Sequence, residues 1–458
     1  MQAISHRAVL RQGGRADYKA RQVTRGRASI PMERGLIEVK ALHGYGSLDS
    51  WPLMLADSRG LMPVSGAVAC TPVPEADSIN DRILPMRLLI LLLLPATLLM
   101  GQSKHGKTVN GIERLLYVTN KSGISVYDIN DSHKLIRNID VPETGDYKGI
   151  SASVPLGRLY LTSNLKDDLV CLDLATEKIL WRRKYSDGYV DSQAMSPDGK
   201  TIYIPLRDGD SWWVLDAATG DVKAKIKTEH GKPYDKDDHP IAGVGPHNTW
   251  MNRDGSRVYL EVLTVPYIFI ADTGTNQVIG KIGPFSKGLR PIAISDDEKY
   301  AYANVDWLLG FEVGAVRDGD KWGGKMLHRV EAKTPAARLA QLPNPPAHKP
   351  HSTMSHGINI TPDQKEIWMV DGVYGYVYVY NVEKMPPRHI ADIPLFKDPG
   401  ETPKPGWISF SIDGKYAYPD GGVVIDALTK KVAARIPTSE KLLEIDFQNG
   451  TAVKAGHR

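Results

Sequence analysis

A short turn that recurs along the chain constrains its fold more than any other feature. Copies of this turn, most with Asp at the third position, occur at 196–200, 252–255, 295–298, 361–364 and 411–414, with a degenerate copy at 154–157. In the fullest copy, Ser-Pro-Asp-Gly-Lys, proline presets φ, the aspartate bonds its own backbone, and glycine takes a positive φ. Such a turn closes a hairpin between two strands. The recurrent turns therefore predict a series of β-hairpins along the chain.

Four alternating strands surround each copy of the turn. A strand precedes the turn, a Tyr-rich strand follows it, a third strand ends in Asp, and a fourth follows a Thr-Gly-type turn. The turns are spaced 42, 56, 43, 66 and 50 residues apart, counted from 156, 198, 254, 297, 363 and 413. Four strands repeated at this spacing indicate β-propeller blades. We expect seven blades, at 115–147, 148–189, 190–244, 245–289, 290–354, 355–404 and 405–441.

The two ends of the repeat region complement each other. The first blade lacks an innermost strand, because 115–120 has the pattern of a second strand. At the other end, the alternating segment 442–447 has no partner of its own. If this segment completes the first blade, it removes two sheet edges that would otherwise invite aggregation. The predicted fold is all-β: a seven-bladed β-propeller of four-stranded antiparallel blades, with the ring closed by a C-terminal strand.

Residues 117–120 spell Tyr-Val-Thr-Asn, and the Ser-Pro-Asp-Gly-Lys turn accompanies them. Over residues 110–450 the chain resembles exported bacterial YVTN-repeat propellers, in the superfamily of the quinoprotein amine dehydrogenase β-chain. Its relatives include surface-layer proteins, lactonase-like hydrolases and the propeller domain of nitrous oxide reductase. The resemblance implies the propeller fold but no single function.

The most apolar stretch lies before the repeats, at 86–100, with Arg82 and Arg87 at its start and small and polar residues after it. This is the anatomy of a signal peptide, which we place at 86–103, and a periplasmic or secreted protein follows from it. An uncleaved membrane anchor is the alternative. We interpret 1–85 as a mis-assigned or disordered extension, with translation starting at Met86, and 104–458 as the propeller.

Charge and cysteine content exclude several classes of function. The net charge is +4, and residues 1–103 hold 12 Lys/Arg and 8 Asp/Glu, so the remainder holds 45 of each. A balanced remainder argues against nucleic-acid binding. The two cysteines exclude a Cys-based metal cage and a disulfide scaffold. We expect a monomer without a membrane span after cleavage, whose partner is a small molecule or an envelope protein.

In a propeller the innermost strand of each blade lines the central channel and begins at its mouth. Counting seven residues back from each turn Asp, or its equivalent, locates these starting positions: Gly149, Asp191, His247, Arg290, His356 and Gly406, with Glu444 as the approximate counterpart in the closing strand. Lys148 and Trp407 flank this ring. We predict a ligand site there, formed by Asp191, His247, Arg290, His356, Trp407 and Glu444.

Two long insertions lead into inner strands at the same mouth, at 228–246 and 317–355. The second is rich in proline, so we expect a stiff, irregular lid without a helix. Together with the strand starts, the insertions supply histidines for a divalent metal such as zinc, copper or iron: His239, His247, His351 and His356. The alternative is that these histidines make ordinary hydrogen bonds or cap loops.

Two classes of function follow. The first is an envelope binding or interaction module that uses the channel mouth. The second is an enzyme, either a metal-dependent hydrolase or lyase or an oxidoreductase. In the enzyme, His247 and His356 would be metal ligands or acid–base groups, Arg290 would clamp an anion, and Asp191 and Glu444 would support them.

Overall fold

The computed structural model describes residues 105–186, 188–229, 231, 245–343, 354–437 and 441–456, and four short strands nearer the N-terminus. The chain divides into two units, Met1–Pro95 and Ala96–Arg458. The first contains two hairpins, formed by β1 (Ala28–Met32) with β2 (Gly35–Val39) and by β3 (Leu55–Asp57) with β4 (Gly60–Met62). The predicted signal peptide at 86–103 lies outside the described residues. None of the described helices is long and apolar enough to cross a membrane.

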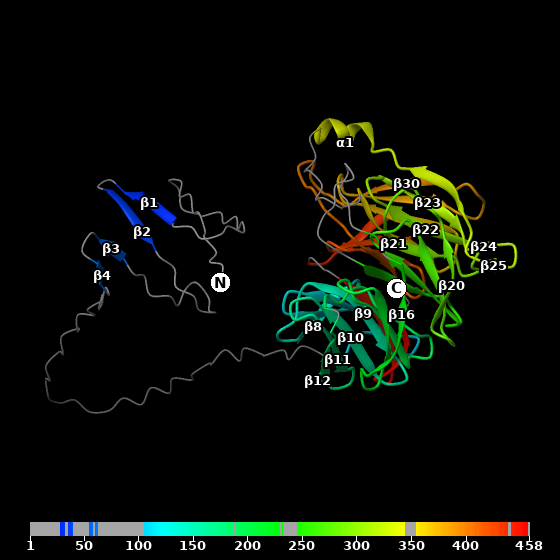
Figure 1. The fold of residues 1–458 in the computed structure, drawn as a ribbon, viewed down its shortest axis with the longest axis horizontal. Coiled ribbons are helices and arrows are strands. Elements are labelled where there is room, and N and C mark those ends of the chain that lie inside the picture. The colour runs from blue at the N-terminus through cyan, green and yellow to red at the C-terminus, as the bar shows by residue number, and fades with distance from the viewer. Residues whose placement is uncertain are drawn as a thin grey trace, which may run out of the picture. The chain divides into compact units, whose positions relative to one another are not determined.

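The second unit is the predicted propeller, drawn from cyan to red in Figure 1. Six blades in its described part are four-stranded antiparallel sheets. Blade two contains β9 (Tyr147–Ser153), β10 (Arg158–Ser163), β11 (Asp168–Asp173) and β12 (Ile179–Lys184). Blade three contains β13 (Ala194–Met195), β14 (Thr201–Pro205), β15 (Ser211–Asp216) and β16 (Val222–Lys227). Blade four contains β17 (Pro246–Met251), β18 (Arg257–Val262), β19 (Ile268–Asp272) and β20 (Gln277–Ile282).

The remaining blades repeat this order. Blade five contains β21 (Leu289–Ile294), β22 (Tyr300–Val305), β23 (Gly310–Ala315) and β26 (Met326–Glu331), with a small hairpin of β24 (Arg317–Asp318) and β25 (Lys321–Trp322). Blade six contains β27 (Ser355–Ile360), β28 (Glu366–Asp371), β29 (Tyr376–Asn381) and β30 (Arg388–Pro394). Blade seven contains β31 (Ile408–Phe410), β32 (Tyr416–Pro419), β33 (Val423–Asp426) and β34 (Lys431–Arg435).

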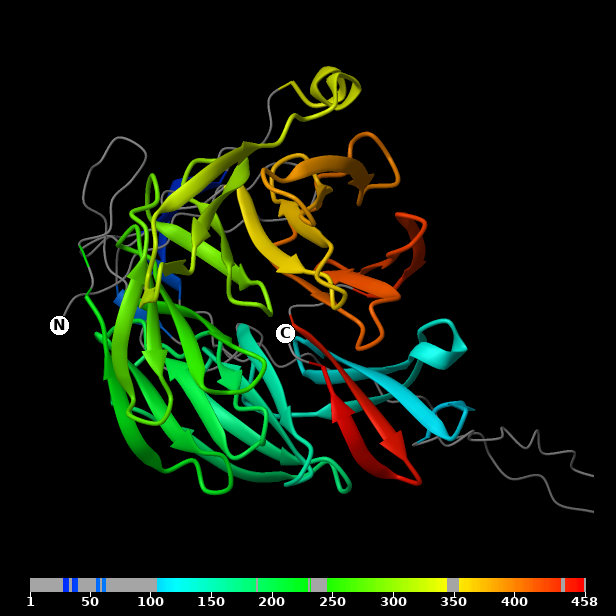
Figure 2. The same cartoon turned by 90° about the vertical axis from the view of Figure 1, so that its right-hand side faces the viewer.

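The first blade closes the ring as predicted and carries two strands more than expected, β5 and β36. Its sheet contains β36 (Thr451–Ala455), β35 (Leu442–Gln448), β6 (Ile112–Asn120), β7 (Gly123–Asp128) and β8 (Lys134–Asp140) in that spatial order, and β5 (Thr108–Val109) also pairs with β6. The extra strand β36 follows Asn449 and Gly450, which both take positive φ, at 51° and 78°. This is the geometry of a type I′ hairpin turn. Figure 2 shows the C-terminal end of the chain near the centre of the ring.

Burial decreases from the axis outward. Every residue of the inner strands β17 and β21 is buried, whereas the outer strands β16 and β34 are mostly exposed. The core consists of apolar clusters between neighbouring sheets. One such cluster joins Tyr259 and Ile270 of blade four to Tyr302 of blade five. Stability therefore comes from packing between blades, since one sheet alone cannot bury both of its faces.

The recurrent turns have the predicted chemistry. Asp198 accepts hydrogen bonds from the Lys200 amide and the Ser196 hydroxyl, and Gly199 takes a φ of 69°. Where glycine is replaced, Glu298 and Gln364 take the same positive φ. The turns are therefore defined by the aspartate bonds as much as by glycine.

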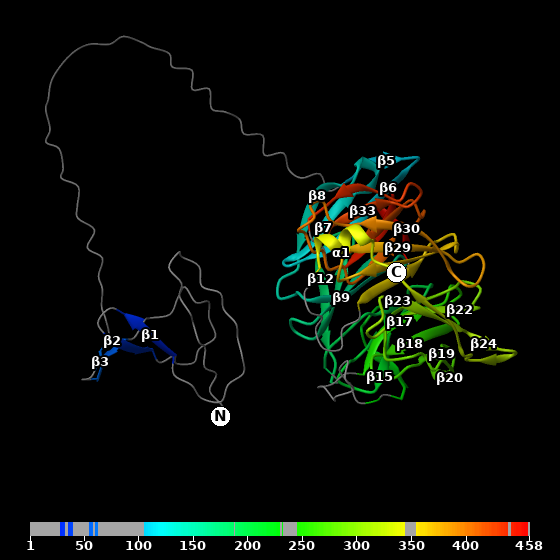
Figure 3. The same cartoon turned by 90° about the horizontal axis from the view of Figure 1, so that it is seen from above.

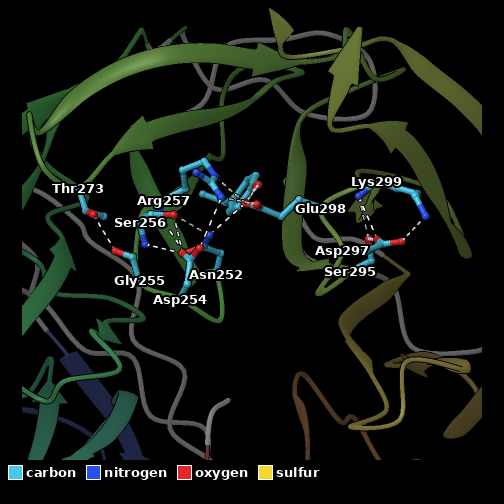
Figure 4. Close-up of polar contacts among 11 residues, drawn as sticks. Asn252, Asp254, Gly255, Ser256, Arg257, Thr273, Ser295, Asp297, Glu298 and Lys299 are labelled. Carbon is cyan, nitrogen blue, oxygen red and sulfur yellow. Dashed lines mark hydrogen bonds and ion pairs between the residues drawn. The ribbon is translucent and has the colours of Figure 1, made fainter. Parts of the chain in front are cut away.

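A polar network joins blades four and five at these turns, as Figure 4 shows. Glu298 accepts hydrogen bonds from Nε of Arg257 at 2.7 Å, from its Nη2, and from the Tyr259 hydroxyl at 2.6 Å. Asn252 donates to the same carboxylate at 3.2 Å. Because its bidentate partner lies on the next blade, Glu298 fastens two sheets together.

The second insertion, 317–355, is less irregular than expected, because β24, β25 and β26 lie within it as well as a helix. Residues Ala336–Gln341 form a helix, α1, labelled in Figure 3 and seen projecting from the ring in Figure 2, so the prediction of a lid without a helix is wrong there. Alanine, leucine and glutamine favour helix, and Pro335 at the N-cap marks where it starts. Arg338 is buried and donates to the carbonyl oxygens of Tyr374 and Glu401, at 3.0 and 2.6 Å, so the helix is anchored to blade six.

Candidate binding site at the channel mouth

The site begins where the inner strands begin. His247, Arg290 and His356 are each the second residue of β17, β21 and β27. Asp191 precedes β13, and a parallel bridge between Ser192 and Asn248 brings blades three and four together beside it. Counting back from the turns thus identified residues that the fold brings to one end of the channel.

The imidazole rings of His247 and His356 are neighbours, with centroids 6.1 Å apart and planes at 72°. His356 donates from Nδ1 to the carbonyl oxygen of Gly406 at 2.7 Å, because a carbonyl only accepts. In the neutral ring, Nε2 of His356 is therefore an acceptor. His247 shares a 2.7 Å hydrogen bond between Nδ1 and Oε2 of Glu261, and its Nε2 lies 4.0 Å from Oδ2 of Asp191.

Two ion pairs act on these rings, one with a half-buried arginine and one buried on both sides. Arg207 donates from Nη1 to Oδ2 of Asp191 at 3.3 Å. Arg290 pairs with Asp306 at 2.8 Å and donates to the Leu289 carbonyl at 2.8 Å. Arg290 and Asp306 are each at most 4% exposed. The guanidinium of Arg290 therefore pairs with a carboxylate that directly follows the second strand of its own blade.

Trp407 lies at the mouth, as expected, and its ring makes a cation–π contact with Lys441. The Lys441 ammonium sits 3.8 Å from the ring centroid. The backbone amides of Gly406 and Trp407 both donate to Oδ1 of Asp420, at 2.6 and 3.0 Å. Lys441 and Asp420 thus hold the start of the seventh blade's inner strand in place.

Glu444 does not lie with the other predicted residues. Its carboxylate accepts from Nε of Arg114 at 2.8 Å and from the Ile412 amide at 2.6 Å. Ile412 belongs to the turn after β31, so Glu444 faces the opposite end of the inner strands, which we name the turn end. At the mouth, the closing strand contributes Lys441 instead. Predicted metal ligands His239 and His351 lie outside the described residues.

Sequence reasoning missed the acidic residues that the second strands supply. Asp306 and Asp420 directly follow β22 and β32, and Glu261 interrupts the otherwise apolar β18. An acid at the end of a second strand or directly after it recurs in blades five, six and seven, where Asp371 is the last residue of β28. That repetition was the signal that could have identified them.

Burial shifts the pKa values of the acids and histidines at the mouth. It raises the pKa of Glu261 to about 8, of Asp306 to about 7 and of Asp420 to about 6, against the opposing attraction of nearby cations. Burial also lowers the pKa of His356 to about 4 and that of His247 well below its usual range. Both imidazoles and Glu261 are therefore neutral at pH 7, among cations that keep their charge.

Two buried polar atoms beside His247 have no hydrogen-bond partner among the described residues. They are Nε of Arg207, a donor, and Oε1 of Glu261, which belongs to a side chain with no exposed surface. Buried polar atoms in folded proteins nearly always have a partner. The mouth is therefore suited to a bound molecule that both accepts and donates hydrogen bonds.

The described residues contain no group of three or more metal-ligating side chains placed to hold a metal ion. Arg207 and Arg290 lower the pKa of His247 by their positive charge, and the same field opposes a bound cation. The predicted divalent metal site stays a prediction, because two of its four histidines lie outside the described residues.

Comparison with known proteins supports the fold. No family model matches the chain, and no curated protein matches it. Solved structures do match: the hydrazine synthase of Kuenenia stuttgartiensis is similar with a TM-score of 0.50 and 15% identity, over 71% of this chain and 92% of that one. Similarity at this identity shows the fold alone. The chain is a seven-bladed β-propeller, and its place in the YVTN-repeat family stays a prediction.

Proposed function

We propose that the chain is a binding or interaction protein that holds a small polar ligand at the channel mouth. The proposal rests on two buried atoms that have no partner among the described residues, Nε of Arg207 and Oε1 of Glu261, whose side chains both interact with His247. A molecule with both donors and acceptors, such as an amino acid or a sugar acid, satisfies both atoms. The propeller fold suits such a role, because it brings residues from several blades to one point.

The neighbouring groups favour a polar ligand over a bare anion. The mouth contains both cations and acids, and burial raises the pKa of Glu261 and Asp306, which favours their protonated forms. Nε2 of His356 adds an acceptor, because Nδ1 already donates to Gly406. A ligand here would exchange hydrogen bonds with groups that are already desolvated, which strengthens each bond.

The experiment is a thermal-shift titration of the purified propeller, 104–458, with a panel of amino acids, sugar acids and dicarboxylic acids. A ligand present at a hundred times its Kd stabilises by about 2.7 kcal/mol, which raises Tm by several degrees. Arg207→Lys keeps the charge facing Asp191 but removes the Nε donor. Glu261→Gln keeps the size of the side chain. Lys431→Ala, on the outer strand β34, is the control.

We expect at least one panel compound to raise Tm, the two mouth variants to lose most of that rise, and Lys431→Ala to keep it. If no compound raises Tm, or the rise survives in both mouth variants, the proposal is wrong. The unpartnered atoms would then be satisfied by water alone.

We further propose that the protein acts outside the cytoplasm, as the apolar run at 86–100 and the arginines before it support. Cell fractionation followed by N-terminal sequencing tests this. The expected N-terminus lies close to residue 104. A protein in the cytoplasm that keeps residues 1–85 would contradict it.

A further inference from the structure

A cavity of about 260 Å³ lies at the turn end, away from the histidines. Its walls include Trp250 from β17, Asn359 from β27 and Phe410 from β31. His247 is four residues before Met251, which also lines the cavity, and this distance along a strand is about 13 Å. The cavity is therefore a separate site from the mouth.

The end of the extra strand β36 supplies one wall of the cavity, through Lys454 and Ala455 and through Gly456, which follows the strand. It is the last strand of its sheet, paired only with β35 among the described strands. The Gly456 amide donates to the Glu444 carbonyl of β35 at 2.7 Å. Since backbone groups alternate along an antiparallel strand, the amide and carbonyl of Ala455 face away from β35. The cavity wall thus carries a free sheet edge.

Two cationic side chains line the cavity, Arg253 and Lys454, and they differ in their ion pairs. Arg253 makes an ion pair with Asp296 at 2.8 Å. Lys454 lies opposite Asp446 in the β35–β36 register and its charge attracts that carboxylate, but no ion pair within 4 Å joins its ammonium to a described carboxylate. An acidic group on a ligand would therefore lie close to the Lys454 ammonium if the ligand bound at the free edge of β36.

The volume of the cavity and the side chains that line it indicate which class of ligand it can bind. The volume is below the 300 Å³ or so at which pockets for drug-sized molecules begin. Trp250 and Phe410, 7% and 8% exposed, offer apolar walls next to the strand edge. An extended peptide uses a free edge for its backbone and apolar walls for alternate side chains.

We propose that this cavity binds the carboxyl end of an extended peptide. The peptide backbone pairs with Ala455 at the free edge of β36, an apolar side chain packs against Trp250 and Phe410, and the terminal carboxylate lies near Lys454. The site is independent of the function proposed for the mouth.

The test is affinity selection with a pool of N-acetylated tripeptides of random sequence, in which the propeller, 104–458, retains members identified by mass spectrometry. The same pool with carboxamide ends is the chemical control. We expect retained peptides to have free carboxyl ends and to share a large apolar side chain at one position. Amidation should weaken binding at least tenfold.

Two variants locate the site. Lys454→Met, at an exposed side chain, should reduce the affinity of the free acids to that of the amides. Ala455→Pro removes the outward amide and should abolish binding of both acids and amides, whereas Lys431→Ala on the outer strand β34 should change the binding of neither.

Three results would overturn the proposal: no peptide is retained, amides and acids bind equally, or N-acetylated single amino acids bind as tightly as tripeptides. The last result would assign the cavity to small carboxylic acids. Unchanged binding in Lys454→Met would likewise contradict it.

Discussion

The imidazole of His247 shares a 2.7 Å hydrogen bond with the carboxyl group of Glu261, and neither side chain is more than 9% exposed. The two residues come from the first and second strands of blade four. Because burial raises the pKa of Glu261 and lowers that of His247, the pair is neutral at pH 7. A neutral, desolvated pair at the channel mouth is the chemical centre of the proposed site.

The protonation of Glu261 predicts how stability depends on pH. Its pKa is about 8 in the folded chain and near 4.5 when unfolded, so between these values the folded state holds a proton that the unfolded state has released. The free energy of unfolding therefore falls as pH rises from about 4.5 to 8. Glu261→Gln should reduce this fall by a few kcal/mol, measured by urea unfolding at pH 5, 6.5 and 8. Equal slopes in the variant and the parent would contradict the burial of a protonated carboxyl.

The ion pair between Arg290 and Asp306 should be costly to break on one side only. Arg290→Met leaves a buried acid without its cation, and we expect a loss of about 3–5 kcal/mol in the free energy of unfolding. The double variant Arg290→Met/Asp306→Asn should recover part of that loss, because no uncompensated charge remains. Chemical denaturation of both variants measures the difference. Additive losses would show that the two side chains do not interact.

The network at Glu298 should stabilise the contact between blades four and five. Glu298→Gln weakens a bidentate bond to Arg257 and should cost about 1–3 kcal/mol. The matched control is Arg253→Ala, which removes an ion pair between the same blades at a side chain that is 80% exposed. We expect the control to cost at most about 1 kcal/mol. Similar losses in both variants would mean that Glu298 has no special role.

Closure of the ring predicts a sharp difference between two truncations. Removal of the last 17 residues, from 442 onward, deletes β35 and with it the buried Leu443, Ile445 and Phe447. That variant should unfold or aggregate, because the first and seventh blades lose their connection and expose sheet edges. Removal of 451–458 alone deletes β36 and should leave a folded ring. Circular dichroism and size-exclusion chromatography distinguish the two results, and a monomeric, folded 17-residue truncation would contradict the closure.

The fold could be predicted from the sequence because the residues that specify each blade lie close together along the chain. Each turn carries its own aspartate and mostly its own glycine, so the blades could be counted without knowing how they pack. The strand β36 was missed although Asn449-Gly450 is a strong hairpin signal. The helix α1 was not predicted, because the prolines of the insertion disfavour a helix more strongly than the short run of helix formers at 336–341 favours one.

From the sequence, only the site residues on the inner strand of each blade could be predicted. A fixed distance from a turn located His247, Arg290 and His356, because strands advance regularly. The same count failed for Glu444, because no turn of the recurrent type accompanies the closing strand. Glu261 and Asp306 reach the site from neighbouring strands, so their roles depend on pairing and burial that no count along the chain contains.

The most direct test of a desolvated binding site at the mouth is an NMR titration of the chain with ¹⁵N-labelled histidine side chains, in which His247→Gln and His356→Gln assign the two signals. The account predicts that His356 stays neutral, with its proton on Nδ1, until the pH approaches about 4. It also predicts that a compound which raises Tm shifts the signals of His356 and His247 while histidines on outer strands stay unchanged. Titration of both rings near pH 6.5, with no response to any such compound, would contradict it.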